Sequence, residues 1–502
     1  MEYIMNYCLG IDIGGTTVKA SVFDVNGREL GTAASNTAVI SDEPGKVERD
    51  LALTWKGILE VIQGSCDRAG IKPSAIDFIS TTGHGKGAYL RFSGEEWPSV
   101  GIVSNDTRAA RLAASLGTSR EYTEVVLPRI TQPLWPSHSS AMLSWMQREQ
   151  PDRFSKIDQV LFSKDFITTM LTGRHVTDYT VATGSGLYRT DDNQVDREVL
   201  RFFGVSQLEG ALPEALPSHE VAGSVRREVA AATGLREGTP VTAGLFDVNA
   251  AALACAIEAD REMGLVVGTW NIALATTTNP DSFRSSWADL AVQAHCIPGQ
   301  WMIHEGSPTS ASNLEWWVQK LFTLGGPVAW ERINELVAET ERTGVWFFPY
   351  IYGSHGNPDA TGTLVGLRSD STPGEVIRAI YEGITYQLRE HALPISRQMP
   401  RIDHLRLAGG AKRSAPWVQI ITDAFNLALS LSPTEEIGAL GAVISGAVGV
   451  GAYPDYPAAV RGMTLSGEAR KPRAEKHSHL DERFQQFLRL RAALDGAWEA
   501  AV

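Results

Sequence analysis

The sequence predicts an α/β protein with two large domains around a central cleft. A chain of 502 residues is too long for one hydrophobic core. One structural device also occurs twice: an apolar strand, a turn rich in Gly and Thr, and a second strand, first over residues 7–25 and again over residues 263–278. Stretches with apolar residues at helical spacing follow both copies. Two such halves indicate a duplicated architecture with a cleft between them.

The first copy of this device begins near the N-terminus. Residues 7–13 are predicted as a strand, residues 14–17 as a turn, and residues 18–25 as a second strand with alternating apolar and polar residues. Asn26-Gly27 is a strong signal for a two-residue hairpin turn, so residues 28–33 are expected to form a third strand. The glycine turn therefore joins strand to strand, whereas a dinucleotide fingerprint or a Walker A loop requires a strand, a loop and then a helix.

The remaining elements are predicted from periodicity and from helix-capping patterns. Residues 51–63 have the apolar spacing of a helix, and residues 76–81 are expected to form a strand. Thr372-Pro373-Gly374-Glu375 predicts a helix start, because Thr caps, Pro suits the first turn and Glu suits the third position. Ser414 is expected to cap another helix, and residues 480–498 to form an amphipathic helix on a domain surface. We place an N-terminal domain at 1–258, a C-terminal domain at 262–455 and a C-terminal extension at 456–502.

Composition and charge favour a soluble cytoplasmic enzyme without nucleic-acid or membrane partners. Lys plus Arg is 45 and Asp plus Glu is 58, so the net charge is −13 and a basic nucleic-acid footprint is absent. No signal peptide is recognisable at the N-terminus, and the apolar stretches are too short for a membrane span. The four cysteines are scattered and form no cluster with histidine, which argues against a disulfide framework, a zinc site or another tightly bound transition metal.

The two Gly- and Thr-rich turns are candidate grips for the phosphates of a nucleotide. Successive N–H groups in a tight turn form an anion-binding nest, and glycine lets the backbone approach phosphate closely. The candidate phosphate contacts are Thr16, Thr17 and Lys19 around the first turn, and Gly268 and Thr269 in the second. Asp12 is placed to orient a hydrated Mg²⁺. Each turn alone also fits an ordinary hairpin, and Lys19 fits a solvated lysine; the second turn favours the phosphate interpretation, because two turns can clamp one phosphate chain.

Asp247 is the candidate catalytic base. It follows a β-like run and precedes a helix of small residues, so it is expected at a helix N-terminus, where the carboxylate is favoured over the acid. A carboxylate near a substrate hydroxyl can accept its proton during phosphoryl transfer. The alternative is a plain N-cap aspartate, which spacing alone would favour.

Polar and aromatic loops are candidate contacts for a polyhydroxylated ligand. The Gly-rich segment 82–87 and the segment 104–108 offer donors and acceptors, and an aromatic face suits sugar C–H groups. The candidate residues are His84, Lys86, Asn105, Asp106, Arg108, Trp135 and His138. The alternatives are a flexible loop with a solvated Lys86, a capped helix start at 104–108 and a surface histidine at 138. After residues 405–408, Gly409, Gly410 and Ala411 form a turn against which a flat ring could lie, and the small residues from Gly438 open a closely packed helix.

Taken together, these motifs resemble the FGGY family of carbohydrate kinases over nearly the whole chain. Residues 10–17 resemble the family's first phosphate motif, residues 244–253 its catalytic-Asp motif, and Gly268-Thr269 its second phosphate motif. Residues 362–367 with 375–382 match its long C-terminal signature. One further set of residues resembles the family's adenosine motif: Gly409, Gly410, Ala411, Trp417, Asp423 and residues 438–442.

The resemblance implies two ribonuclease H-like domains of the actin and hexokinase type around the cleft, and transfer from Mg-ATP to a sugar hydroxyl, usually a terminal one. It implies that Asp247 is the base and that the segments at 83–87 and 105–108, with Phe246 beside the base, contact sugar. Sugar is then expected on the N-terminal side and ATP on the C-terminal side. Two departures put the substrate subgroup in question: Trp270 follows the second phosphate turn where Ser is common, and the signature around residues 142–145 lacks its usual Lys.

Within the family, four stretches resemble L-xylulose kinases: residues 83–87, 244–248, 268–270 and 304–316. L-Xylulose or a similar ketopentose is therefore the expected acceptor, with D-xylulose, erythritol and other polyols as alternatives. An actin-like or chaperone-like ATPase and a non-catalytic sugar sensor are the alternatives from other classes. The assembly is left open, with a homodimer among the options.

Overall fold

The computed structural model describes residues 6–37, 39–268, 270–354, 357 and 359–501. The chain forms two compact units. Unit 1 comprises residues 1–256, 277–302 and 436–465, and unit 2 comprises residues 257–276, 303–435 and 466–502. Within the described part of the chain, no helix is long and apolar enough to cross a membrane.

The units differ from the predicted division in two segments. The sequence places residues 262–455 in one domain and 456–502 in an extension, whereas residues 277–302 and 436–465 group with unit 1. The physical reason for the second segment is helix α15 (Ile437–Gly449), which packs on strands β1 and β6 of unit 1 and on helix α10. Leu440 and Val443 of α15 share a buried cluster with Phe78 of β6.

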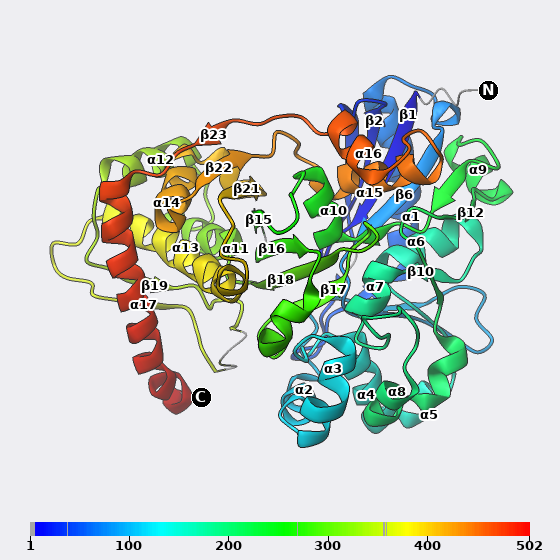
Figure 1. The fold of residues 1–502 in the computed structure, drawn as a ribbon, viewed down its shortest axis with the longest axis horizontal. Coiled ribbons are helices and arrows are strands. Elements are labelled where there is room, and N and C mark those ends of the chain that lie inside the picture. Colours follow the sequence, from blue (N-terminus) through cyan, green and yellow to red (C-terminus); the bar gives the residue numbers. More distant parts are fainter. Residues whose placement is uncertain (1–5, 38, 269, 355–356, 358, 502) are drawn as a thin grey trace. The chain divides into compact units, whose positions relative to one another are not determined.

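A mixed sheet forms the centre of unit 1 (Figure 1). Its strands run in the order β12-β13-β6-β1-β2-β3, and β14 also pairs with β6. Their bounds are β1 Tyr7–Ile13, β2 Thr17–Asp24, β3 Glu29–Asn36, β6 Phe78–Gly83, β12 Val221–Ser224, β13 Pro240–Thr242 and β14 Leu245–Phe246. The predicted hairpins are confirmed, because β1 pairs antiparallel with β2 and β2 antiparallel with β3.

Smaller sheets and helices surround this sheet. The smaller strands of unit 1 are β4 Val39–Ile40, β5 Glu48–Asp50, β7 Ala88–Phe92, β8 Val100–Ile102, β9 Ile157–Leu161, β10 Val176–Asp178, β11 Glu214–Leu216 and β17 Ala291–Ala294. Its helices are α1 Leu51–Ala69, α2 Ala110–Gly117, α3 Leu127–Ile130, α4 Ser139–Glu149, α5 Pro151–Phe154, α6 Ser163–Thr172, α7 Tyr179–Gly184, α8 Arg197–Phe203, α9 Arg227–Thr233, α10 Asp247–Ala254, α15 and α16 Tyr456–Met463. The predicted helix from Leu51 is confirmed and continues to Ala69, where Gly70 ends it in the left-handed conformation.

Side chains alternate along β1 between two buried clusters. Leu9, Ile11 and Ile13 belong to the cluster that includes α1 and α6, whereas Cys8 belongs to the cluster that includes α10 and α15. This period of two is typical of a strand with both faces covered. Asp12 lies on the same face as Cys8, which directs its carboxyl group toward the start of α15 rather than toward α1.

The strand ends determine where polar side chains gather in unit 1. β6 runs parallel to β1 and to β14, and Gly83 at its end pairs with both Ile13 and Phe246. Because carboxyl ends of parallel strands meet at one edge, the residues that follow them lie near one another. This edge receives Asp12, His84 and Asp247.

Unit 2 repeats the arrangement. β15 pairs antiparallel with β16 and parallel with β21, as β1 does with β2 and β6, which confirms the predicted second copy of the device. Its strands are β15 Glu262–Val267, β16 Asn271–Thr277, β18 Trp301–Ser307, β19 Trp346–Phe348, β20 Thr363–Val365, β21 His404–Ala408, β22 Ala428–Leu431 and β23 Ala469–Arg470. Its helices are α11 Ala311–Trp316, α12 Trp330–Glu339, α13 Pro373–Gln398, α14 Ala415–Phe425 and α17 Ala474–Ala501.

The predicted helix starts of unit 2 are also confirmed. Thr372 and Glu375 form a capping box at the start of α13, and Ser414 caps α14 through the N–H of Trp417. The C-terminal helix α17, red in Figure 1, packs on α13 and α14 with Leu480, Phe484 and Phe487 buried.

Candidate active site

Asp12 and Asp247 lie at the carboxyl-end edge of the unit 1 sheet. Asp12 is the penultimate residue of β1, and Asp247 is the first residue of α10, directly after β14. Both side chains are half-buried. Asp247 stands at a helix N-terminus, as the sequence predicts, but Phe246 occupies the N-cap position. The alternative of a plain N-cap aspartate therefore does not describe Asp247.

The protonation of Asp247 differs from the expectation. Its pKa is raised to about 8, first by burial and second by the negative charge of Asp12. The pKa of Asp12 is raised to about 7, by burial and then by Glu436, whereas Lys19 lowers it. Loss of water and a neighbouring carboxylate both disfavour the charged form, and together they outweigh the helix terminus. The hydrogen bond from the first turn of α10 lowers the pKa of Asp247 in the expected direction, but burial and Asp12 raise it by more.

The same acidic cluster fits a hydrated divalent cation. Asp12, Asp247 and Glu436 bring three carboxyl groups together with Lys19, whose Nζ lies 2.9 Å from Glu436. Oxygen ligands suit Mg²⁺, which usually keeps several waters and few protein ligands. In the described ranges, no group of three or more His, Cys, Asp or Glu side chains could hold a metal ion by itself. Asp12 is the residue that would hold Mg²⁺, through its waters.

Gly438 provides a test of how closely Asp12 must be placed. A Cβ atom at Gly438 would lie 3.1 Å from Asp12 Cγ and closer still to Oδ2, so the carboxyl group must move. We expect Gly438→Ala to lower kcat about 10-fold, because a displacement near 1 Å can cost up to about 10²-fold in rate. Gly210→Ala is the matched control, since a Cβ there meets nothing within 4 Å. Steady-state kinetics check this, and equal kcat values for the two variants would show that Asp12 tolerates the shift.

Arg49 holds the first Gly-rich turn from inside the protein. Its guanidinium donates to the carbonyl oxygens of Gly14 and Gly15 over 2.6 and 2.7 Å, and its side chain is only 1% exposed. Thr16 remains exposed at the tip of the turn, and Thr17 is half-buried. Lys19 is not simply solvated, because both carboxylate oxygens of Glu436 accept hydrogen bonds from it.

The Arg49 side chain also reaches the loop of His84. Arg49 donates to Tyr89 Oη over 2.7 Å, and Tyr89 Oη lies 3.3 Å from His84 Nε2. His84 Nδ1 lies 2.7 Å from the carbonyl oxygen of Lys86, so Nδ1 carries the proton and Nε2 accepts from Tyr89. Burial and then Arg49 lower the pKa of His84 to about 3, which keeps the ring neutral. One chain of hydrogen bonds thus joins the phosphate turn to the predicted sugar loop.

Asp106 and Arg108 form a buried pair. The Asp106 carboxylate accepts hydrogen bonds from the backbone N–H of Val47 and from the guanidinium of Arg108, which also pairs with Glu48 at 2.9 Å. Both oxygens of Asp106 are therefore occupied within the protein, and its carboxylate orients Arg108. Asn105 is exposed. Helix α2 begins later, without a side-chain cap, so the capped helix start is not what this segment forms.

The aromatic loop lies close to the Lys86 segment. Lys86 Nζ stands 4.6 Å from the centre of the Trp135 ring, a cation–π contact, so Lys86 does not extend freely into solvent. His138 is fully buried and accepts a hydrogen bond from the N–H of Trp135, so the surface-histidine alternative is wrong. Phe246 is buried, and a Cβ atom at Gly85 would lie 2.6 Å from its ring. The Phe246 ring therefore supports the loop that carries His84 and Lys86.

Of the predicted nucleotide residues in the C-terminal half, Gly268 and those between Gly409 and Trp417 lie in unit 2, whereas Gly438 lies in unit 1. Gly268 donates to the carbonyl oxygen of Trp270 over 3.1 Å, which closes the turn between β15 and β16. Thr269 lies outside the described residues. Near the same turn, Asn271 donates to the carbonyl oxygen of Thr309, and Ala311 donates to that of Gly268. The turn is thus tied to the segment after β18.

The second group of nucleotide candidates follows β21. Gly409 adopts a φ of 91°, a conformation that favours glycine, and Gly410 and Ala411 continue the turn into α14. Ala411 is buried. Trp417 is also buried and donates to Thr385 Oγ1 over 3.1 Å, so its ring packs inside unit 2.

Several site residues carry no local sequence signal. Lys19 and Glu436 are 417 positions apart, and Arg49 and Tyr89 are 40 positions apart. In unit 2, Ser307 Oγ lies 2.7 Å from Nε2 of His391, a residue that no sequence motif singled out. Co-variation between these positions is the signal that could reveal them.

Comparison with known proteins identifies the family of this chain. Models of the FGGY family of carbohydrate kinases match residues 7–254 as the N-terminal domain and residues 263–450 as the C-terminal domain. The L-xylulose/3-keto-L-gulonate kinase of Escherichia coli is 30% identical, with 98% of this chain and 97% of that protein covered. The probable L-xylulose kinase of Pasteurella multocida is 32% identical over 90% of this chain and 92% of that protein.

A solved structure gives the same result. The xylulose kinase of Rhodospirillum rubrum is 26% identical, covers 98% of this chain and 100% of its own, and superposes with a TM-score of 0.85. The expected two-domain α/β fold of these kinases is confirmed. The chain belongs to the FGGY family of carbohydrate kinases, phosphotransferases that act on small sugars or polyols.

Proposed function

We propose that this kinase transfers the γ-phosphoryl group of ATP to a terminal hydroxyl of a ketopentose, with L-xylulose as the first candidate. The names of the Escherichia coli and Pasteurella multocida relatives support this sugar. The observation that supports the chemistry most is the Asp12 and Asp247 pair, in which the pKa of Asp247 is about 8. A general base is most effective when its pKa lies near the working pH.

In this proposal Asp247, once deprotonated, accepts the proton of the sugar hydroxyl while that oxygen bonds to the γ-phosphorus. The bond between the γ-phosphorus and the bridging β-phosphate oxygen breaks, and ADP leaves. The backbone N–H of Gly15 and the hydroxyls of Thr16 and Thr17 donate to phosphate oxygens, whereas the N–H of Gly14 donates to the carbonyl oxygen of Thr17 and closes the turn. Mg²⁺, when bound, neutralises the charge on those oxygens. The loop of His84 and Lys86, with Trp135 beside it, encloses the sugar and limits the access of water, which would otherwise compete as the acceptor.

A panel of acceptors tests the substrate. ADP release is measured with L-xylulose, 3-keto-L-gulonate, D-xylulose, erythritol and glycerol, and without an acceptor. We expect kcat/KM for L-xylulose to exceed that for D-xylulose by about 10²-fold, because the two sugars are enantiomers and a site that hydrogen-bonds the hydroxyls of one leaves polar groups unpaired with the other. If kcat/KM for erythritol or D-xylulose exceeds that for L-xylulose, that compound rather than L-xylulose is the substrate. Equal ATP hydrolysis in every well, without a phosphorylated product, would contradict sugar transfer itself.

The cytoplasmic location and the homodimer stay predictions. Size-exclusion chromatography with light scattering measures the assembly directly, and a mass near the 54.5 kDa of one chain would exclude a stable dimer.

A further inference from the structure

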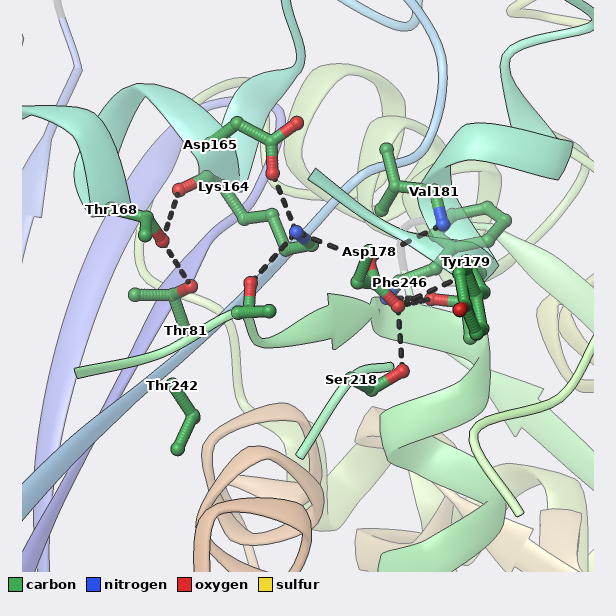
Figure 2. Close-up of polar contacts among 12 residues, drawn as sticks. Thr81, Lys164, Asp165, Thr168, Asp178, Tyr179, Val181, Ser218, Thr242 and Phe246 are labelled. Carbon is green, nitrogen blue, oxygen red and sulfur yellow. Dashed lines mark hydrogen bonds and ion pairs between the residues drawn. The ribbon is translucent and has the colours of Figure 1, made fainter. Parts of the chain in front are cut away.

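Three fully buried ionisable side chains, Lys164, Asp165 and Asp178, form a cluster (Figure 2). The cluster contacts residues 243–246, the segment that leads to Asp247. Lys164 Nζ lies 2.5 Å from Asp165 Oδ1 and 3.1 Å from Asp178 Oδ1. Lys164 and Asp165 belong to α6, and Asp178 ends β10 and caps α7. Buried ion pairs contribute little net stability, because desolvation offsets the attraction between the charges. Their contacts with the surrounding backbone are therefore more informative than their charges.

Those contacts converge on residues 243–246, the turn before Asp247. Lys164 donates a further hydrogen bond to the carbonyl oxygen of Ala243 over 2.9 Å. Asp178 Oδ2 accepts from Thr180 Oγ1 over 2.7 Å and from Ser218 Oγ over 2.6 Å. The turn is also fixed by Gly244 N–H, which donates to the carbonyl oxygen of Ser218 over 3.1 Å.

Thr180 makes the link nearest to Asp247. Its hydroxyl accepts a hydrogen bond from the backbone N–H of Phe246 over 2.8 Å. A hydroxyl has one proton, and that of Thr180 is donated in a hydrogen bond to the Asp178 carboxylate. The Thr180 oxygen therefore acts as an acceptor toward the N–H of Phe246. Phe246 is the N-cap residue of α10, and its position fixes where the helix begins.

The turn needs this support because its backbone is unusual. Gly244 has a φ of 76°, and a Cβ atom there would overlap the carbonyl oxygen of Thr81 on β6. The chain thus reverses at Gly244 against β6, pairs briefly as β14 and enters α10 at Asp247. A small backbone rotation at Phe246 would therefore displace the carboxyl group of Asp247, the next residue in the chain.

We propose that Thr180, oriented by Asp178 and Lys164, is a positioning residue for Asp247. This inference rests on the proposed role of Asp247 as the base. The hydroxyl, rather than the lysine, is the group to test, because removal of Lys164 would leave two buried carboxylates without their partner.

The test compares Thr180→Val with Thr180→Ser. Valine keeps the shape but removes the hydroxyl, whereas serine keeps the hydroxyl. We expect Thr180→Val to lower kcat about 10-fold with KM for ATP nearly unchanged, since misplacement of a reacting group by about 1 Å costs up to about 10²-fold. Thr180→Ser should restore most of the rate.

Thr233→Val is the matched control for a lost buried hydroxyl. Like Thr180 Oγ1, Thr233 Oγ1 accepts from a backbone N–H, that of Leu235, but it donates to the carbonyl oxygen of Val229 rather than to a carboxylate, and it lies in α9 away from the turn. We expect it to lower the melting temperature about as much as Thr180→Val does, with kcat unchanged. Equal kcat values for the two valine variants would overturn the inference.

A double variant separates positioning from general damage. Interacting sites are non-additive, so Thr180→Val should cost nothing further in kcat on an Asp247→Asn background. A further 10-fold loss, about the same as in the wild type, would show that Thr180 acts independently of Asp247 and would overturn the inference. If Asp247→Asn alone keeps wild-type kcat, the proposed base fails and the inference fails with it. If Asp247→Asn is inactive but Thr180→Val behaves as Thr233→Val, only the inference fails.

Discussion

Asp247→Asn is expected to reduce kcat by about 10³-fold, within the range of about 10²–10⁴-fold that general base catalysis contributes. Asparagine keeps the size of the side chain but cannot accept the proton of the sugar hydroxyl. KM for ATP should change little, because the proposed function assigns the phosphates to the Gly-rich turns rather than to this side chain. The coupled ADP-release assay with saturating sugar measures both quantities.

The control for this variant is Asp289→Asn, which removes the same charge from an exposed position of unit 1. We expect it to keep wild-type kinetics. Near-normal turnover of Asp247→Asn would exclude Asp247 as the base. A rise in KM without a fall in kcat would instead assign Asp247 to substrate binding.

Asp12→Asn is expected to lower activity about 10- to 100-fold, the usual cost of losing a group that holds a metal ion through its waters. The activity should recover partly at high Mg²⁺ concentration, because a neutral amide weakens the binding of the cation without removing its other contacts. A titration of kcat/KM against Mg²⁺ measures this. An unchanged Mg²⁺ dependence would contradict the role assigned to Asp12.

The same variant has a second effect that depends on pH. The pKa values of Asp12 and Asp247 are raised to about 7 and about 8 from 3.8, the ordinary value of an aspartate side chain. Between about pH 4 and pH 8 the folded protein therefore binds more protons than the unfolded chain. The free energy of unfolding without ligands thus decreases as the pH rises through this range. Asp12→Asn removes one of these groups and lowers the pKa of the other.

We therefore expect Asp12→Asn to melt above the wild type at pH 8 and close to it at pH 4. Each kcal/mol gained raises the melting temperature by about 2 °C in a large domain. Differential scanning calorimetry without ATP or Mg²⁺ across this pH range checks the sign. A wild type that melts higher than the variant at pH 8 would show that the Asp12 carboxylate is compensated in the folded state.

Local patterns in the sequence predicted the framework of the site. The β1–β2 and β15–β16 hairpins, the start of α13 at Thr372 and the helix at Asp247 depend on neighbouring residues, and the structure confirms each of them. The protonation of Asp247 was not predictable in this way. It depends on burial and on Asp12, which a sequence window around residue 247 does not contain.

Polar contacts between residues far apart in the sequence were equally unpredictable from local patterns. Asp106 was predicted as a sugar contact, yet its carboxylate is occupied by Arg108 and by the backbone of Val47. The buried pair of Lys164 and Asp178 gave no signal, because a lysine and an aspartate 14 positions apart are usually solvated. Such contacts follow from the packing of α6, β10 and α7 rather than from any short motif.

Product analysis tests the central claim most directly. The protein is incubated with ATP, Mg²⁺ and L-xylulose, and ADP and sugar phosphate are quantified together by mass spectrometry for the wild type and for Asp247→Asn. The account predicts one sugar phosphate for each ADP in the wild type and about 10³-fold less of both in the variant. Abundant sugar phosphate from the variant would contradict the account. So would ADP without any sugar phosphate from the wild type with every acceptor of the panel.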